Sequence, residues 1–141
     1  MRVLSLCADP IDPQVLYAAV FLAGVYKSRD GGATWTAANT GLTTLNVFSL
    51  AIDPAAPETV YAGGQQGALC RSIDGGASWT PIGADLDISG IRGLAVGGGR
   101  PAVLYLATLA DGVLMSVDGG ASWSALNDGL TALDIRCFAA T

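Results

Sequence analysis

The sequence predicts an all-β protein: a segment of a β-propeller with about three four-stranded antiparallel blades. One eight-residue frame occurs three times, as SRDGGATW at 28–35, SIDGGASW at 72–79 and SVDGGASW at 116–123, each copy starting 44 residues after the last. Each 44-residue unit also contains four short runs of β-branched, aromatic and apolar residues between turn-forming clusters. A tandem unit of this length with four strands has the size of a propeller blade.

The second unit shows the four expected strands most clearly. They are VFSLAI (47–52), TVYAGG (59–64), ALCRS (68–72) and SWTPI (78–82). The prolines of DPAAP force a loop between the first two strands, and GQQG and IDGGA supply the next two turns. No window has a sustained apolar period of 3.6 residues, so we expect no helices.

The repeat register divides the chain, residues 1–141, into blade units of approximately 1–44, 45–88 and 89–132, followed by an extra first strand at 133–141. The extra segment LDIRCFAAT aligns with MRVLSLCAD at the start of the chain. Propellers close with typically four to eight blades. We therefore expect a single partial propeller that is completed by the remaining blades of a longer chain. The alternative is a homodimer that completes a six-bladed ring.

Composition excludes several classes of function. The net charge is −5 and the seven Lys and Arg residues do not form a run, so we expect no nucleic-acid partner and no anionic membrane partner. The chain has no histidine, which excludes a His-based triad, a His-ligated zinc and an imidazole acid or base. Cys7, Cys70 and Cys137 fall on unrelated repeat positions and are expected to be packing residues. No metal and no cofactor are expected.

The N-terminus does not have the pattern of a signal peptide. Its apolar run VLSLCA has six residues, which is shorter than a signal-peptide core, and it aligns with VFSLAI at 47–52. We therefore interpret it as the first strand of the repeat. No uninterrupted apolar run reaches the roughly 18 residues of a membrane-spanning helix.

The repeated frame predicts a locked hairpin turn between the third and fourth strands. Its Asp accepts hydrogen bonds from N–H groups of the turn, and its Gly residues adopt positive φ. Its Trp is expected to begin the outermost strand and to pack against neighbouring structure. Three equivalent acids on successive blades lie too far apart to share one glycosidic bond, so a structural role is expected and no catalytic residue is assigned. The structural residues are Ser28, Asp30, Gly32, Trp35, Ser72, Asp74, Gly76, Trp79, Ser116, Asp118, Gly120 and Trp123.

The frame resembles the Asp-box, or bacterial neuraminidase repeat, with the pattern S-x-D-x-G-x-T-W. The wider unit, IDPAAPETVYAG followed by RSIDGGASWTPI, is similar to the propeller repeats of sialidases, xyloglucan-active glycoside hydrolases, sortilin-type receptors and photosystem II assembly-factor-like proteins. The resemblance covers essentially the whole chain. It implies a propeller whose Asp-boxes lie away from the active face, and an extracellular or periplasmic location.

The resemblance to sialidases implies an arginine cluster, a Tyr and Glu pair and a further acid, and this chain does not supply them. The single Glu, Glu58, lies in a Pro-rich loop. Arg92 and Arg136 occupy equivalent first-strand positions, but their counterparts are Leu4 and Phe48, so the arginines are not expected to cluster. A xyloglucanase-like site would instead require two opposed acids in a cleft.

The loops after the second and fourth strands emerge on one face, at 19–23, 38–46, 63–67, 82–90, 107–111 and 126–134. Any ligand is expected on this face, at 38–46, 63–67, 82–90 and 107–111. Binding faces use loops because strand residues are occupied in packing between blades. The main hypothesis is a non-catalytic scaffold that recognises a protein or a glycan. The alternative is a fragment of a sialidase-like or xyloglucanase-like glycoside hydrolase whose catalytic residues lie mostly outside this chain. The candidate ligand-binding acids on this face are Asp85, Asp87, Asp111 and Asp128, with Asp134 beside them.

Overall fold

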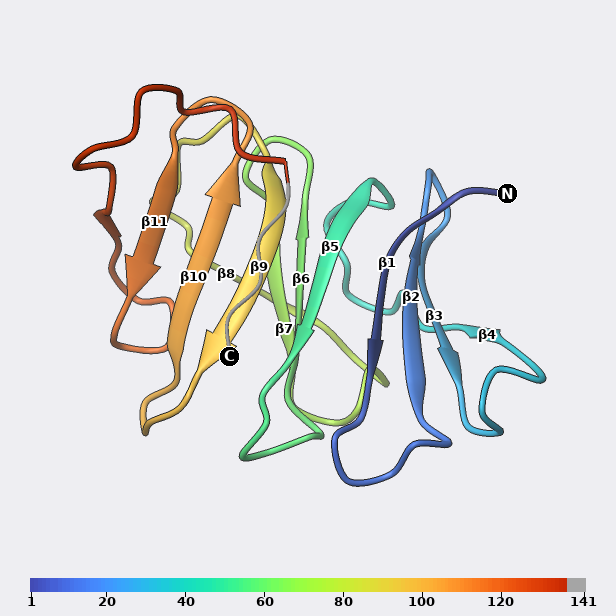
Figure 1. Cartoon of the computed structure of the whole chain (residues 1–141). Coiled ribbons are helices and arrows are strands. Elements are labelled where there is room, and N and C mark those ends of the chain that lie inside the picture. The colour runs from blue at the N-terminus through green and yellow to red at the C-terminus, as the bar shows by residue number, and fades with distance from the viewer. Residues whose placement is uncertain (137–141) are drawn as a thin grey trace.

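The computed structural model describes residues 1–136, and these form three four-stranded antiparallel sheets without a helix (Figure 1). Within each sheet the strands are hydrogen-bonded in chain order. Blade 1 contains β1 (Val3–Ala8), β2 (Leu16–Val20), β3 (Gly24–Ser28) and β4 (Thr36–Ala37). Blade 2 contains β5 (Val47–Ile52), β6 (Val60–Gly64), β7 (Leu69–Ser72) and β8 (Thr80–Ile82). Blade 3 contains β9 (Ile91–Gly97), β10 (Val103–Thr108), β11 (Val113–Ser116) and β12 (Ser124–Ala125). The predicted fold class is confirmed.

The outermost strand of blade 2 is shorter than the sequence predicts. We expected the fourth strand of blade 2 at 78–82, but β8 begins at Thr80. The backbone N–H of Ser78 donates to the Asp74 carboxylate and is therefore not available to the ladder with β7. The repeated Trp consequently lies just before the outermost strand and not in it.

The blades stand side by side with their first strands β1, β5 and β9 adjacent (Figure 1). The apolar core lies between blades, in two clusters that each join residues of two neighbouring blades. One cluster joins Tyr17 and Val25 of blade 1 to Leu50 and Trp79 of blade 2. A second cluster joins residues of blade 2 such as Leu69 to residues of blade 3 such as Ile91, Leu94 and Leu104.

The two described cysteines are free thiols that pack in the first core cluster. Cys70 is buried there, and Cys7 packs against the cluster from β1. Burial raises the pKa of the Cys7 thiol to about 12. Cys137 lies outside the described residues.

The segment that follows blade 3 is hydrogen-bonded to the edge of that blade. The Gly112 N–H donates to the Leu133 carbonyl, and the Ile135 N–H donates to the Thr108 carbonyl. Residues 133–136 form no strand, and the rest of the expected extra strand lies outside the described residues. Among residues 1–136 there is no helix of the length and apolarity needed to span a membrane.

Candidate functional site

Each repeated turn is closed by hydrogen bonds among its own residues. In blade 1 the Ser28 hydroxyl donates to the Asp30 carboxylate over 2.8 Å and accepts from the Gly32 N–H. The same carboxylate accepts from the N–H and the hydroxyl of Thr34. The hydroxyl of Thr34, its N–H and the Ser28 hydroxyl together lower the pKa of Asp30 to about 2.

The other two turns repeat this arrangement with serine in place of threonine. The Ser78 hydroxyl and N–H donate to Asp74, whose pKa is lowered to about 2 chiefly by the Ser78 hydroxyl. The Ser122 hydroxyl and N–H donate to Asp118 in the same way and hold its pKa well below the ordinary value. In all three turns the carboxylate is occupied within its own turn.

The turn of blade 2 also binds the preceding blade through its backbone. Gly75 and Gly76 have φ of +65° and +82°, a left-handed region that glycine adopts without strain. This conformation presents the Gly75 carbonyl to blade 1, where it accepts from the Tyr17 hydroxyl at 3.0 Å and from the Lys27 ammonium at 2.7 Å. This turn therefore joins β7 to β8 and also binds blade 2 to blade 1.

The repeated tryptophans pack on the blade that precedes their own. Trp79 is 4% exposed, and its indole N–H donates to the Ala38 carbonyl of blade 1 at 2.8 Å. Trp123 packs likewise into the cluster between blades 2 and 3. Trp35 has no such neighbour among the described residues: it is 37% exposed and its indole N–H donates to Gly32 within its own turn. The structural role of the twelve turn residues stays a prediction, and stability measurements test it.

The loops that follow the second and fourth strands lie together on one face of the molecule, called the loop face below. The Gly24 N–H donates to the Leu45 carbonyl and the Gln65 N–H donates to the Asn46 carbonyl, so the loops after second and fourth strands meet at one edge. The Leu109 N–H likewise donates to the Gly90 carbonyl.

The acids predicted on this face differ in their surroundings. Asp111 accepts from the N–H and the hydroxyl of Ser89, each at 3.1 Å. Asp134 forms an ion pair with Arg136 at 3.0 Å. The remaining three acids are exposed and make no hydrogen bond with the described residues; they are Asp85, Asp87 and Asp128. Among residues 1–136, no group of three acids or thiols has the arrangement of a metal site.

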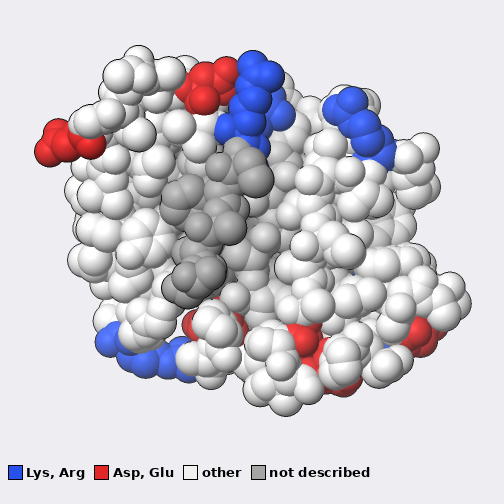
Figure 2. All heavy atoms as spheres, viewed as in Figure 1, with Lys and Arg blue, Asp and Glu red and all other residues white. Residues whose placement is uncertain are grey.

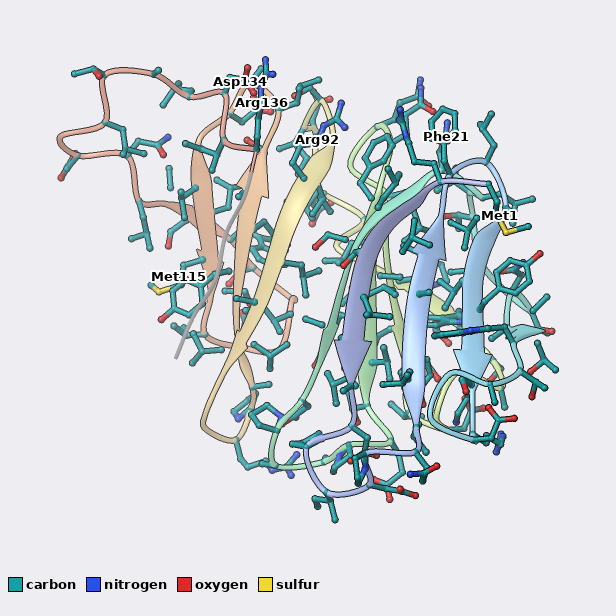
Figure 3. The ribbon with its side chains drawn as sticks, turned by 45° about the vertical axis from the view of Figure 1, so that its right-hand side comes forward. Met1, Phe21, Arg92, Met115, Asp134 and Arg136 are labelled. Atoms are coloured by element: carbon teal, nitrogen blue, oxygen red, sulfur yellow. The ribbon has the colours of Figure 1, made fainter. Side chains whose placement is uncertain are left out.

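Two arginines meet on this face, so the expectation that the arginines do not cluster is wrong for this pair. Arg92 and Arg136 line one cavity of about 280 Å³ together with Leu109. Figure 3 shows both arginines at the upper edge of blade 3 beside Asp134. They meet because they hold equivalent positions 44 residues apart, so that the start of β9 and the segment after blade 3 reach the same rim. That equivalence was the signal in the sequence.

Aromatic rings support two of the arginines, which sequence reasoning did not anticipate. The Arg92 guanidinium carbon lies 4.4 Å from the centre of the Phe48 ring, and that of Arg2 lies 4.6 Å from the Phe21 ring. Stacking of this kind restricts the side chain while its N–H donors stay free to bind. Charged side chains of both signs lie at the upper edge in Figure 2.

Comparisons with known proteins identify the class. No family model matches the sequence, and no curated protein matches it. Solved structures do match. A GH74 xyloglucanase from Xanthomonas campestris has a TM-score of 0.67 and 27% identity, covering 86% of this chain and 20% of that one. GH74 from Niastella koreensis has a TM-score of 0.75 and 20% identity, covering 96% of this chain and 23% of that one.

YCF48 bound to the D1 peptide has a TM-score of 0.70 and 23% identity, covering 88% of this chain and 40% of that one. The chain is thus similar to propellers of both an enzyme group and a peptide-binding protein. It spans between 20% and 40% of the lengths of these three structures. The fold defines it as a segment of a β-propeller.

Proposed function

We propose that this chain is a non-catalytic part of an Asp-box propeller, a rigid scaffold that binds a protein segment on its loop face. The observation that carries the proposal is the cavity where Arg92 and Arg136 stand around Leu109. Guanidinium groups form paired, charge-assisted hydrogen bonds with carboxylates, and an apolar floor suits an aliphatic side chain. The ligand that fits is an extended peptide with a carboxylate beside an apolar residue.

The two arginine side chains that line this cavity are held in place before any ligand binds. Phe48 holds Arg92 from one side. Asp134 accepts from Nε and Nη2 of Arg136, which fixes this side chain and leaves its Nη1 for a ligand. Fixing long side chains before binding lowers the entropy cost of association. The structure of YCF48 with a D1 peptide shows that a propeller of related fold does bind a peptide. This likeness supports a protein partner more directly than a glycan.

A glycoside hydrolase fragment is the second candidate, favoured by the likeness to a GH74 xyloglucanase at 27% identity and to an ancestral GH74 enzyme at 26% identity. Catalysis would need two opposed acids. Of the acids on the loop face, Asp111 is bound by Ser89 and Asp134 by Arg136. The other three, Asp85, Asp87 and Asp128, are exposed to solvent on loops. We therefore propose that this chain alone has no glycosidase turnover.

Peptide binding is tested by fluorescence anisotropy with a labelled peptide ending in Asp-Leu with a free carboxylate, and with the same peptide amidated at its C-terminus and carrying Asn for Asp. We expect the charged peptide to bind more tightly. Arg92→Gln and Arg136→Gln should each weaken its binding about tenfold or more. Arg29→Gln is the matched control because this exposed arginine lies in the turn at the opposite face. Equal effects of all three substitutions would refute the proposal.

The enzyme alternative is tested on the same samples with xyloglucan and sialyl oligosaccharides. Turnover that disappears with Asp85→Asn, Asp87→Asn or Asp111→Asn would replace the scaffold proposal with a hydrolase. Absence of turnover together with peptide binding that depends on Arg92 would support the scaffold.

A further inference from the structure

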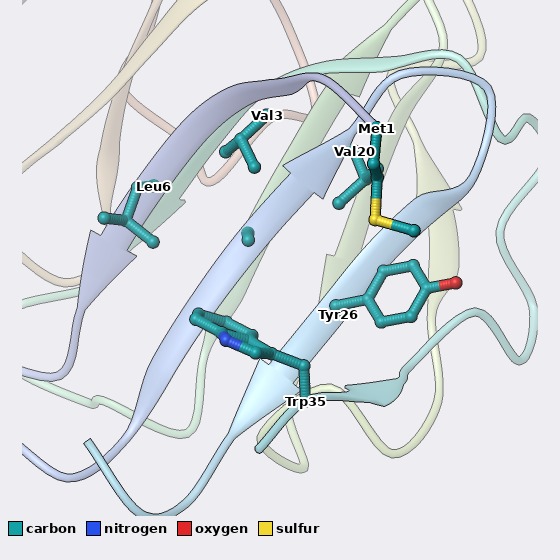
Figure 4. A pocket seen from close by; sticks show the side chains of 7 residues that line it. Met1, Val3, Leu6, Val20, Tyr26 and Trp35 are labelled. Carbon is teal, nitrogen blue, oxygen red and sulfur yellow. The ribbon is translucent and has the colours of Figure 1, made fainter. Parts of the chain in front are cut away.

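One broad face of blade 1 is apolar and open. It holds a cavity of about 650 Å³, seen from close by in Figure 4. Val3 is 57% exposed, Leu6 is 62% exposed and Trp35 is 37% exposed. Continuous apolar surface of this kind on a soluble protein marks an interaction site. The cavity is lined by Met1, Val3, Leu6, Ala18, Val20, Tyr26 and Trp35.

In blades 2 and 3 the face equivalent to this open face of blade 1 is buried. The equivalents of Val3 in blades 2 and 3 are Val47 and Ile91, which are 1% and 0% exposed. In the same way, the equivalents of Leu6 are Leu50 and Leu94, at 5% and 6%. In both cases the preceding blade provides the cover. The open face of blade 1 is therefore one half of an interface that the chain already builds twice.

The other half of that interface is open on blade 3. Ala38 and Leu42 of blade 1 pack against the core cluster shared with blade 2. Their equivalents Ile82 and Leu86 of blade 2 pack against the cluster shared with blade 3.

Leu126 and Leu130 hold the same two positions in blade 3, where they are 43% and 41% exposed. In each blade-to-blade contact inside the chain, the surface equivalent to the open face of blade 3 packs on the surface equivalent to the open face of blade 1. A single chain thus carries both complementary surfaces, one at each end.

We propose that the open face of blade 1 binds the open face of blade 3 of a second copy of this chain. The contact is head-to-tail and repeats the internal blade interface. Two such contacts close two copies into a ring of six blades, a number within the four to eight that propellers use. Ile135 is equivalent to Val47 and Ile91, so docking of β1 of the second copy would displace residues 135 and 136. The two-chain ring and the Arg136 side of the proposed peptide site are therefore alternative states of the same edge of blade 3.

The test is the mass of the full chain in solution, measured by light scattering across a wide range of protein concentrations. We expect a species of twice the 14.2 kDa chain mass that does not grow further with concentration. Leu6→Glu and Leu130→Glu should each give a folded monomer, since one exposed apolar side chain is exchanged for a charge. Ile73→Glu is the matched control: this residue is 71% exposed in the turn after β7 of the middle blade, which carries neither open end face, and its substitution should leave the dimer intact.

Mixing the two monomeric variants tests the head-to-tail geometry. Leu6→Glu keeps a working blade 3 face and Leu130→Glu keeps a working blade 1 face, so an equimolar mixture should recover a two-chain species. A contact between identical faces would not be rescued in this way. A monomeric wild type, species that grow without limit, or a dimer that Leu130→Glu leaves unchanged would each overturn the proposal. Circular dichroism of each variant establishes that it is folded.

Discussion

Replacing Trp79 by alanine should destabilise this protein far more than the same change at Trp35. A tryptophan side chain buries about 200 Å², which at about 25 cal/mol per Å² corresponds to about 5 kcal/mol. Trp79 is 4% exposed and loses nearly all of this, whereas Trp35 at 37% exposure loses about two thirds, or about 3 kcal/mol. Trp79 also loses a part-buried bond to the Ala38 carbonyl, worth about 1 kcal/mol, whereas the bond that Trp35 loses to the Gly32 carbonyl is exposed and is replaced by water. We therefore expect the two free energies of unfolding to differ by about 2 to 3 kcal/mol.

The assay is urea unfolding followed by far-ultraviolet circular dichroism, because removal of a tryptophan alters the fluorescence signal itself. The samples are compared at concentrations where light scattering gives the mass of one chain, so that Trp35 keeps its exposed surroundings. Trp123→Ala should fall between the two, since Trp123 is half-buried and its buried indole N–H has no hydrogen-bond partner among the described residues. Equal losses at Trp79 and Trp35 would refute the inference that each tryptophan is buried by the preceding blade.

Two further predictions concern the repeated turn. The pKa of Asp74 is about 2 in the folded chain, below its ordinary value of 3.8, so its stabilisation is complete above about pH 4 and is lost as the pH falls to about 2. Asp74→Asn should lower the urea midpoint at neutral pH and reduce this acid dependence, and the exposed Asp128→Asn should change neither. Gly76→Ala should cost about 1 to 2 kcal/mol, because φ is +82° and the new methyl would lie 3.1 Å from the Tyr17 ring. Gly98→Ala, with no atom within 4 Å and no positive φ, should stay within about 0.5 kcal/mol of the wild type; a similar loss there would contradict the strain argument.

The sequence by itself determined the strands and the turns because both depend on local chemistry. The 44-residue register located the three sheets, and the Ser-x-Asp-Gly-Gly frame predicted hydrogen bonds that form within a few residues, such as those of Asp30 with Ser28 and Thr34. Periodicity and turn chemistry act along the chain, so they can be read from it. The frames by themselves do not distinguish Trp79 from Trp35, but their places in the repeat series do, because only the central blade has a neighbouring blade on both sides.

Only the tertiary structure decided how the blades meet. It showed that a turn binds the preceding blade through the Gly75 carbonyl, and that Arg92 and Arg136 share one cavity. It also left Leu6 and Leu130 exposed at opposite ends of the blade series, although their equivalents are covered. These outcomes depend on which blade stands next to which. A residue's burial is set by its neighbours in space, and in a repeat protein the same local sequence is covered in the interior and open at the ends.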